Sequence, residues 1–271
     1  MITTTDTTTL SGLATGVLTT AEARAKAAAA LAAAAAWEDG GIQDIGATTP
    51  PDRPARPEHP VLQSPGKMPR RRIGTVEGRI ALLHAVAHIE LNAIDLAWDI
   101  IARFPDMPRA FYDDWVSVGR EEATHFLLID DRLRELGASY GDHPAHDGLW
   151  KSAQSTADDL LARLAIVPLV LEARGLDVTP AMIEKLDRAG DNISADALRI
   201  IYRDEVGHVA IGKRWFDHVC AGRGIDPLAA WRRLVTERFS GGLKPPFNDE
   251  ARQRAGFDSA FYTDLPPGGT A

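Results

Sequence analysis

Residues 115–136 read WVSVGREEATHFLLIDDRLREL, a pattern typical of an amphipathic helix. At about 100° per residue, one face of that helix is apolar except for Glu122 and His125, which stand three residues apart. Residues three apart on a helix share a face, so both side chains are predicted to point into the core. The apolar members of the face are Trp115, Val118, Ile129, Leu133 and Leu136.

A later segment repeats this arrangement, with Glu205 and His208 on one apolar face. Glu90 and Glu172 each interrupt the apolar face of another predicted helix. Glu122 follows Glu90 by 32 residues, and Glu205 follows Glu172 by 33 residues. The sequence therefore predicts two helical hairpins, each of which supplies a glutamate and then a Glu-x-x-His pair. The apolar residues around the second pair are Leu198, Ile201, Gly212 and Val219.

Helical periodicity extends over most of the chain, and strand patterns are too few for a sheet, so an all-α fold is predicted. A short helix is expected at residues 180–189, because Thr179 can cap it and Pro180 suits its first position. Pro168 is expected to kink the third long helix. The four long helices are expected at residues 76–104, 109–136, 156–175 and 194–219.

Three regions are predicted along the chain. The first contains a disordered start over residues 1–20, an alanine-rich helix over residues 21–37 capped by Thr20, and a proline-rich strap over residues 50–69 that crosses the surface. The second is the helical bundle, and the third is a C-terminal helix with an irregular tail. These regions are residues 1–70, 71–222 and 223–271.

The composition is that of an ordinary soluble protein of 271 residues, with 30 basic and 38 acidic side chains and a net charge of −8. The acidic balance disfavours nucleic acid as a partner. No apolar run approaches the roughly 20 residues that cross a membrane, and no leader pattern is found, so a cytoplasmic protein is expected. The one cysteine, Cys220, excludes an internal disulfide and a cysteine-based zinc cluster.

Four glutamates on apolar faces would cost several kcal/mol each without positive charge beside them. The apolar faces supply no lysine or arginine, whereas two divalent metal ions would offset the charge. A glutamate from each of two helices, with Glu-x-x-His from each of two others, is the ligand set of ferritin-like dimetal bundles. Oxygen and imidazole ligands without thiolate suit iron or manganese. The predicted metal ligands, which are also the predicted catalytic residues, are Glu90, Glu122, His125, Glu172, Glu205 and His208.

Four segments of the chain resemble the DUF455 family of the ferritin-like superfamily. The similarity runs from near Arg56 to Glu250 and implies a ferritin-like four-helix bundle with a di-iron or mixed Fe/Mn site at the same six residues. The segments that carry it are HIELNAIDL (88–96), REEATHF (120–126), LEARGLD (171–177) and DEVGH (204–208).

Asp204 and Glu121 each directly precede a ligand glutamate, and we predict that they orient a ligand histidine by accepting its ring N–H. A solvated acid and a direct metal ligand are the alternatives for both residues. Other histidines are given no role in the metal site. His84 and His88 are expected to be satisfied histidines at a surface or interface, and His143 and His146 to be solvated in a loop.

The leading functional prediction is an oxidoreductase that activates O₂ to hydroxylate or otherwise oxidise a small organic substrate. Electrons would come from a separate reductase, because the chain has no electron-transfer cysteines. The alternatives are a ferroxidase, a peroxidase or manganese catalase, a tRNA hydroxylase that uses Arg70 to Arg72, and a non-catalytic metal-binding bundle. The oligomeric state is left open, with a homodimer among the options.

Overall fold

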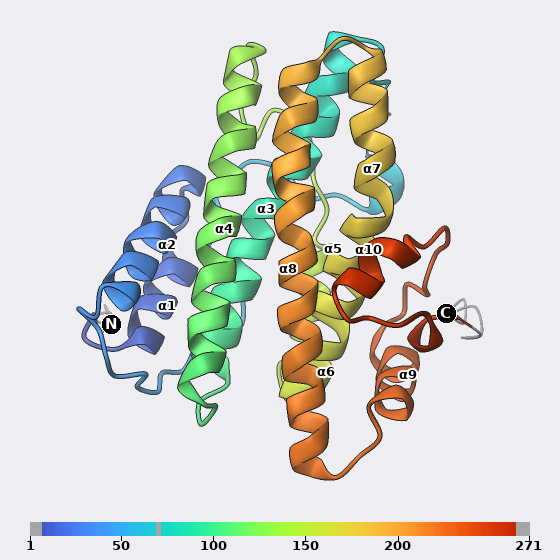
Figure 1. Cartoon of the computed structure of the whole chain (residues 1–271). Helices are drawn as coiled ribbons and strands as arrows, with labels where there is room; N and C mark the ends of the chain where they lie inside the picture. The colour runs from blue at the N-terminus through green and yellow to red at the C-terminus, as the bar shows by residue number, and fades with distance from the viewer. Residues whose placement is uncertain (1–6, 69–71, 264–271) are drawn as a thin grey trace. The chain divides into compact units, whose positions relative to one another are not determined.

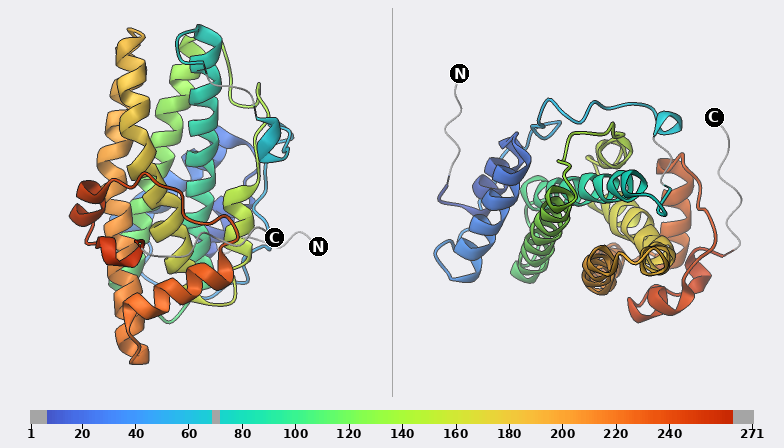
Figure 2. Two further views of the ribbon diagram at one scale, coloured as in Figure 1. Left: turned by 90° about the vertical axis from the view of Figure 1, so that its right-hand side faces the viewer. Right: turned by 90° about the horizontal axis from the view of Figure 1, so that it is seen from above.

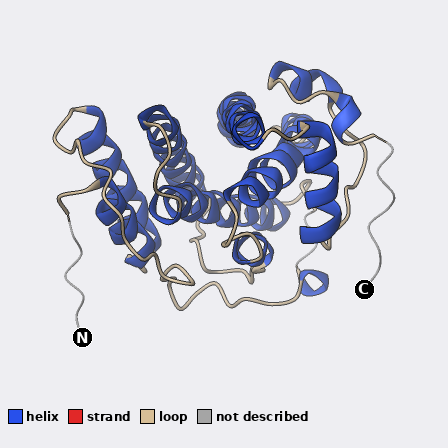
Figure 3. Cartoon of the chain, turned by 90° about the horizontal axis from the view of Figure 1, so that it is seen from below, coloured by secondary structure: helices blue, strands red, loops and turns tan. Residues whose placement is uncertain are grey.

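The computed structural model describes residues 7–68 and 72–263. Over these residues the chain is helical, and its β-structure is an isolated bridge between Leu62 and Ala145 (Figure 3). The predicted all-α fold class is confirmed. The chain divides into two compact units, Met1–Trp150 and Lys151–Ala271, each built of packed helices.

The first unit is built around an antiparallel hairpin of two long helices, α3 (Val76–Arg103) and α4 (Arg109–Glu135). Two shorter helices, α1 (Leu10–Thr19) and α2 (Ala23–Glu38), pack against this hairpin and against each other (Figure 1). A short turn, η1 (Pro65–Lys67), and the start of α5 (Gly148–Gln154) complete the unit. The sequence predicted α3 and α4 to within one residue at each end.

The prediction that residues 1–20 are disordered is wrong over the described part, residues 7–20, where α1 forms. Thr9 caps this helix, and its hydroxyl accepts a hydrogen bond from the Gly12 N–H at 3.2 Å. Leu10, Ala14 and Val17 are spaced along one face and are buried. A helix of this length is marginal alone, so its packing against α2 and α3 stabilises it, and local sequence does not reveal that contact.

The proline-rich strap is fastened to α3 by polar contacts. Arg56 donates to the Asn92 side chain at 2.7 Å and pairs with Asp95 at 3.1 Å. The Asp95 carboxylate is fully buried and also pairs with the fully buried Lys26 of α2. Burial lowers the pKa of Lys26 and raises the pKa of Asp95, and their mutual attraction opposes both shifts. This buried ion pair joins α2, the strap and α3.

The second unit contains another antiparallel hairpin, whose second helix, α8 (Asn192–Arg223), is unbroken. The first arm consists of α6 (Leu160–Ile166), the π-helical segment η2 (Val167–Glu172) and α7 (Ala173–Arg188) in direct succession. After α8, the chain continues through α9 (Pro227–Arg238), which runs at a steep angle to α8 (Figure 2). Two short elements end the described chain, α10 (Asp249–Arg254) and η3 (Ser259–Phe261).

The predicted break between helices 156–175 and 180–189 is wrong, because α7 continues through Pro180. A proline inside a helix lacks the N–H that would bond to the carbonyl four residues earlier, here that of Leu176. The Asn248 side chain donates to this carbonyl at 3.1 Å. The helix tolerates Pro180 because a distant residue replaces the missing donor.

α3 is the one helix of the described ranges that is long and apolar enough to cross a membrane. Most of its apolar window is buried inside the protein. Core packing therefore accounts for its composition.

Replacing Lys26 with Met is expected to lower the free energy of unfolding by about 3–5 kcal/mol, because it removes one of the cations that face the buried Asp95. Lys185→Met, at an exposed position of α7, is the matched control and is expected to change stability by less than about 0.5 kcal/mol. Urea unfolding of both variants checks this. Equal stability of the two variants would contradict it.

Candidate metal centre

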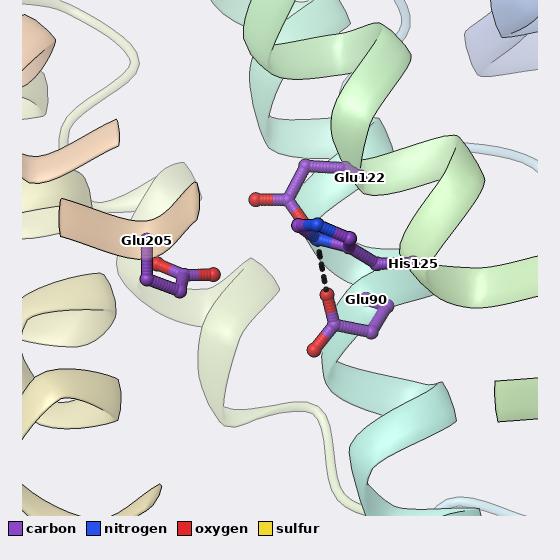
Figure 4. Close-up of side chains that lie close together, drawn as sticks. All are labelled: Glu90, Glu122, His125 and Glu205. Atoms are coloured by element: carbon purple, nitrogen blue, oxygen red, sulfur yellow. Dashed lines mark ion pairs between the residues drawn. The ribbon is translucent and has the colours of Figure 1, made fainter. Parts of the chain in front are cut away.

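Three of the predicted ligands meet inside the hairpin of α3 and α4 (Figure 4). Glu90, Glu122 and His125 are 3%, 0% and 1% exposed. His125 Nδ1 lies 3.4 Å from Glu90 Oε2 and 3.5 Å from Glu122 Oε2. One candidate ligand atom from each of the three residues lies within 4.8 Å of the other two. The hairpin therefore brings two carboxylates and an imidazole to one buried point.

The electrostatics of this cluster favour a cation. Burial alone lowers the pKa of His125, but the hydrogen-bonding carboxylates of Glu122 and Glu90 outweigh it and raise that pKa to about 11. The imidazolium offsets part of the charge of the two glutamates. A divalent ion that replaces its proton would supply more positive charge at the same place, and oxygen and imidazole donors are ligands for iron, manganese or zinc. The residues fit a metal ion.

The second unit carries a matching set of residues. Glu205 and His208 lie one turn apart on α8, with 3.8 Å between Glu205 Oε1 and His208 Nδ1. His208 is fully buried, and Glu205 is 9% exposed. Glu172 is the last residue of η2 and is half-buried. Each unit thus has one glutamate on one arm of a hairpin and a Glu-x-x-His pair on the other arm.

A tight contact fixes the spacing between η2 and α8. A Cβ atom placed on Gly212 would lie 2.2 Å from Pro168 Cβ and 2.4 Å from its Cγ. Gly212 is one turn after His208, and Pro168 is about one turn before Glu172. The glycine therefore permits the close approach of the two segments that carry these predicted ligands. Sequence reasoning placed Gly212 on the ligand face but gave it no role, although a glycine inside a helix was an available signal.

The two acids predicted to orient histidines contact exposed arginines. Asp204 accepts a hydrogen bond from Arg203 Nε at 2.8 Å, and Glu121 lies 3.8 Å from Arg120. These contacts do not show whether either acid also orients a histidine, so that role stays a prediction.

The segment η2, which ends at Glu172, is π-helical, and π-helical turns are frequent at functional sites.

His84 and His88 have hydrogen-bond partners as predicted, but they are buried and do not lie at the surface. The Gly141 N–H donates to His84 Nε2 at 2.9 Å, and the Tyr140 hydroxyl lies 2.8 Å from His88 Nδ1. Burial, with Arg56 nearby, lowers the pKa of His88 to about 4. The two imidazoles fasten the loop after α4 to α3, and local sequence does not reveal this long-range contact.

His143 and His146 are half-buried, so the prediction that they are fully solvated is wrong. Both line a small pocket between α3 and their own loop, together with His84 and His88. His146 Nδ1 accepts a hydrogen bond from the Gly148 N–H at 3.2 Å, and the His143 ring packs edge-on against His84 at 5.4 Å. The loop folds back on α3, which removes these side chains from bulk water.

The fold and this cluster define an all-helical protein with buried glutamate and histidine residues that can bind a metal. The sequence matches the family described as "Protein of unknown function (DUF455)" over residues 19–263. It is similar to an uncharacterized protein of Haemophilus influenzae, with 43% identity over 224 residues that cover 80% of this chain and 78% of that protein. The chain therefore belongs to the DUF455 family. No solved structure matches the chain.

Metal binding at His125 is expected to release about one proton, because a group with a pKa of about 11 is protonated at neutral pH and must lose that proton to become a ligand. The affinity should therefore rise with pH across the neutral range. Calorimetric titration with Mn²⁺ in two buffers of different protonation enthalpy measures the release. His125→Gln should release about one proton fewer. If the binding heat of wild type did not depend on the buffer, no proton would be released, and the prediction that a protonated His125 becomes a ligand would be contradicted.

Gly212→Ala is expected to lower the free energy of unfolding by about 1–3 kcal/mol, because its methyl group overlaps Pro168. Gly207→Ala on the same helix is the matched control, since nothing lies within 4 Å of a Cβ there. That change should stabilise the protein by about 0.5–1 kcal/mol through helix propensity. Thermal and urea unfolding of the two variants give the comparison, and effects of the same sign would contradict the role of the contact.

Proposed function

We propose that the two hairpins pair as a ferritin-like four-helix bundle and that their two ligand sets together hold two divalent metal ions. The observation that supports this most strongly is the repetition of one arrangement. In each unit, a glutamate on one arm of a hairpin accompanies a Glu-x-x-His pair on the other arm. The ligands would be Glu90, Glu122, His125, Glu172, Glu205 and His208.

Charge balance also supports two ions. Four glutamates carry four negative charges, and two divalent ions carry four positive charges. Removing several like charges from water without such compensation is strongly unfavourable. Within the first unit, Glu122 and Glu90 raise the pKa of His125, which supports a preference for positive charge at this point.

We further propose that the site is that of an oxidoreductase that uses O₂ to oxidise a small organic substrate. Iron, or iron with manganese, would supply redox chemistry toward O₂ or peroxide when bound. The glutamates would supply negative charge and oxygen donors, and the two histidines would supply nitrogen donors. A separate cytoplasmic reductase would deliver electrons, because the chain has one cysteine and that residue is buried.

A tRNA substrate receives less support. That alternative relies on Arg70 to Arg72, and Arg70 and Arg71 lie outside the described residues. The observation against it is the net charge of −8, which opposes binding to a polyanion. A small organic molecule is the proposed substrate.

Metal analysis of the purified protein is expected to find about two equivalents of iron, or of iron and manganese, per chain. Glu122→Gln keeps the shape of the side chain but removes its charge, and should at least halve the metal content while the protein stays folded. Glu135→Gln, at an exposed position that pairs with Arg132, is the control and should bind like wild type.

After anaerobic loading with Fe²⁺, wild type should consume O₂ in an oxygen-electrode assay, and Glu122→Gln should consume it at least tenfold more slowly. A wild-type protein that carries no iron or manganese, and gains none on incubation with either ion, would overturn the proposed metal site. Two bound ions without any O₂ consumption would overturn the proposed oxidoreductase activity.

A further inference from the structure

The C-terminal segment 244–262 folds back onto the start of α7, immediately after Glu172. Arg174 Nη1 donates to the backbone carbonyls of Lys244 at 2.6 Å and Pro246 at 3.1 Å. The Asn248 N–H donates to Asp177 Oδ1 at 2.9 Å. The C-terminal segment therefore contacts α7 mainly at one turn, residues 173–177.

Asn248 makes a contact that α7 cannot make for itself. Pro180 leaves the Leu176 carbonyl without its usual helical donor, and Asn248 Nδ2 donates to that oxygen at 3.1 Å. The same Nδ2 group donates its second hydrogen to the Tyr202 hydroxyl at 3.0 Å. Tyr202 lies on α8, three residues before Glu205. One amide group thus ties α7 to α8 near the proposed ligands.

The side-chain oxygen of Asn248 and the nearby Arg252 hold this amide in place. Asn248 Oδ1 accepts from the Ala251 N–H at 3.2 Å and so caps α10. Arg252, on that helix, donates two hydrogen bonds to the buried carboxylate of Asp177, at 2.9 Å and 2.8 Å. Its guanidinium lies over the ring of Tyr262 at 4.4 Å. Planar, two-point pairing of this kind fixes direction as well as distance.

A tail that only covered apolar surface would not need this chemistry. The Arg252 and Asp177 side chains are 3% and 0% exposed, and a buried ion pair commonly adds less stability than well-packed apolar residues of similar size. The Arg252–Asp177 pair instead fixes the position of α10 relative to α7, because each buried charge must keep its partner. Geometry is also what a metal-ligand carboxylate requires from the residues around it.

We infer that Asn248 and Arg252 are positioning residues that hold the turn after Glu172 at a fixed distance from the Glu205 segment of α8. The inference rests on the proposed function, because this distance matters for metal binding only if Glu172 and Glu205 are ligands. The tie between α7 and α8 itself can be measured without any metal.

The first test uses hydrogen exchange of the metal-free protein. Asn248→Asp keeps the cap of α10 but removes both donor hydrogens, so we expect amide exchange at least tenfold faster in residues 170–177 and 200–206. Tyr202→Phe, a milder change that removes only the hydroxyl acceptor, should have a smaller effect, confined to residues 200–206. Asn192→Asp, at the exposed start of α8, is the matched control and should exchange like wild type. Wild-type exchange in Asn248→Asp and in Tyr202→Phe would overturn the inference.

The second test uses Co²⁺ as a spectroscopic probe of the ligand geometry. Asn248→Asp and Arg252→Lys should bind Co²⁺ about 10–100-fold more weakly than wild type, with altered visible absorption bands at saturation. Reduced thermal stability with an unchanged affinity and spectrum would overturn the positioning role. A wild-type protein that binds no Co²⁺, Fe²⁺ or Mn²⁺ would overturn the proposed function instead, and hydrogen exchange would still decide whether the tie exists.

Discussion

Glutamates placed on apolar helix faces constrain the whole structure. A carboxylate removed from water costs several kcal/mol, so each must meet a positive group, and the helices that carry it must be held firmly enough to offset that cost. One turn before Glu122, the backbone of Gly119 packs against the buried ring of Trp98 so closely that a Cβ atom there would lie 2.7 Å from Trp98 Nε1. Packing of this density stabilises the hairpin while the glutamates destabilise it.

The first unit shows two different ways of compensating a buried acid on α3. Asp95 meets Lys26 and Arg56, two cations of the chain itself, and their pairing fastens α2 and the strap. Glu90 and Glu122 meet His125, whose proton can be exchanged for a metal ion. Lysine and arginine cannot act as ligands in that way at neutral pH. The partner therefore distinguishes the two acids of α3: Asp95, which pairs with lysine and arginine, is structural, whereas Glu90, which meets a histidine, is a candidate metal ligand.

Periodicity was sufficient to predict α3, α4 and most of α8, and to place Glu90, Glu122 and His125 on buried helix faces, because a helix face follows directly from spacing. Contacts between distant segments were not predictable in this way. α1 is too short to be stable alone, His84 and His88 are buried by a loop that begins about 50 residues later, and Pro180 is tolerated because of Asn248. Each error arose where a tertiary contact outweighed a local rule.

The two arms that carry single glutamates differ in how they are held. Glu90 lies inside an unbroken helix of 28 residues, where hydrogen bonds within the helix fix its position. Glu172 is the last residue of the π-helical segment η2, which contains Pro168, and Pro180 follows in α7. Asn248, from outside this arm, supplies the hydrogen bond to the Leu176 carbonyl that a regular helix would make itself. Glu172 is also half-buried, whereas Glu90 is 3% exposed. The arm around Glu172 is thus the one whose geometry depends on tertiary contacts.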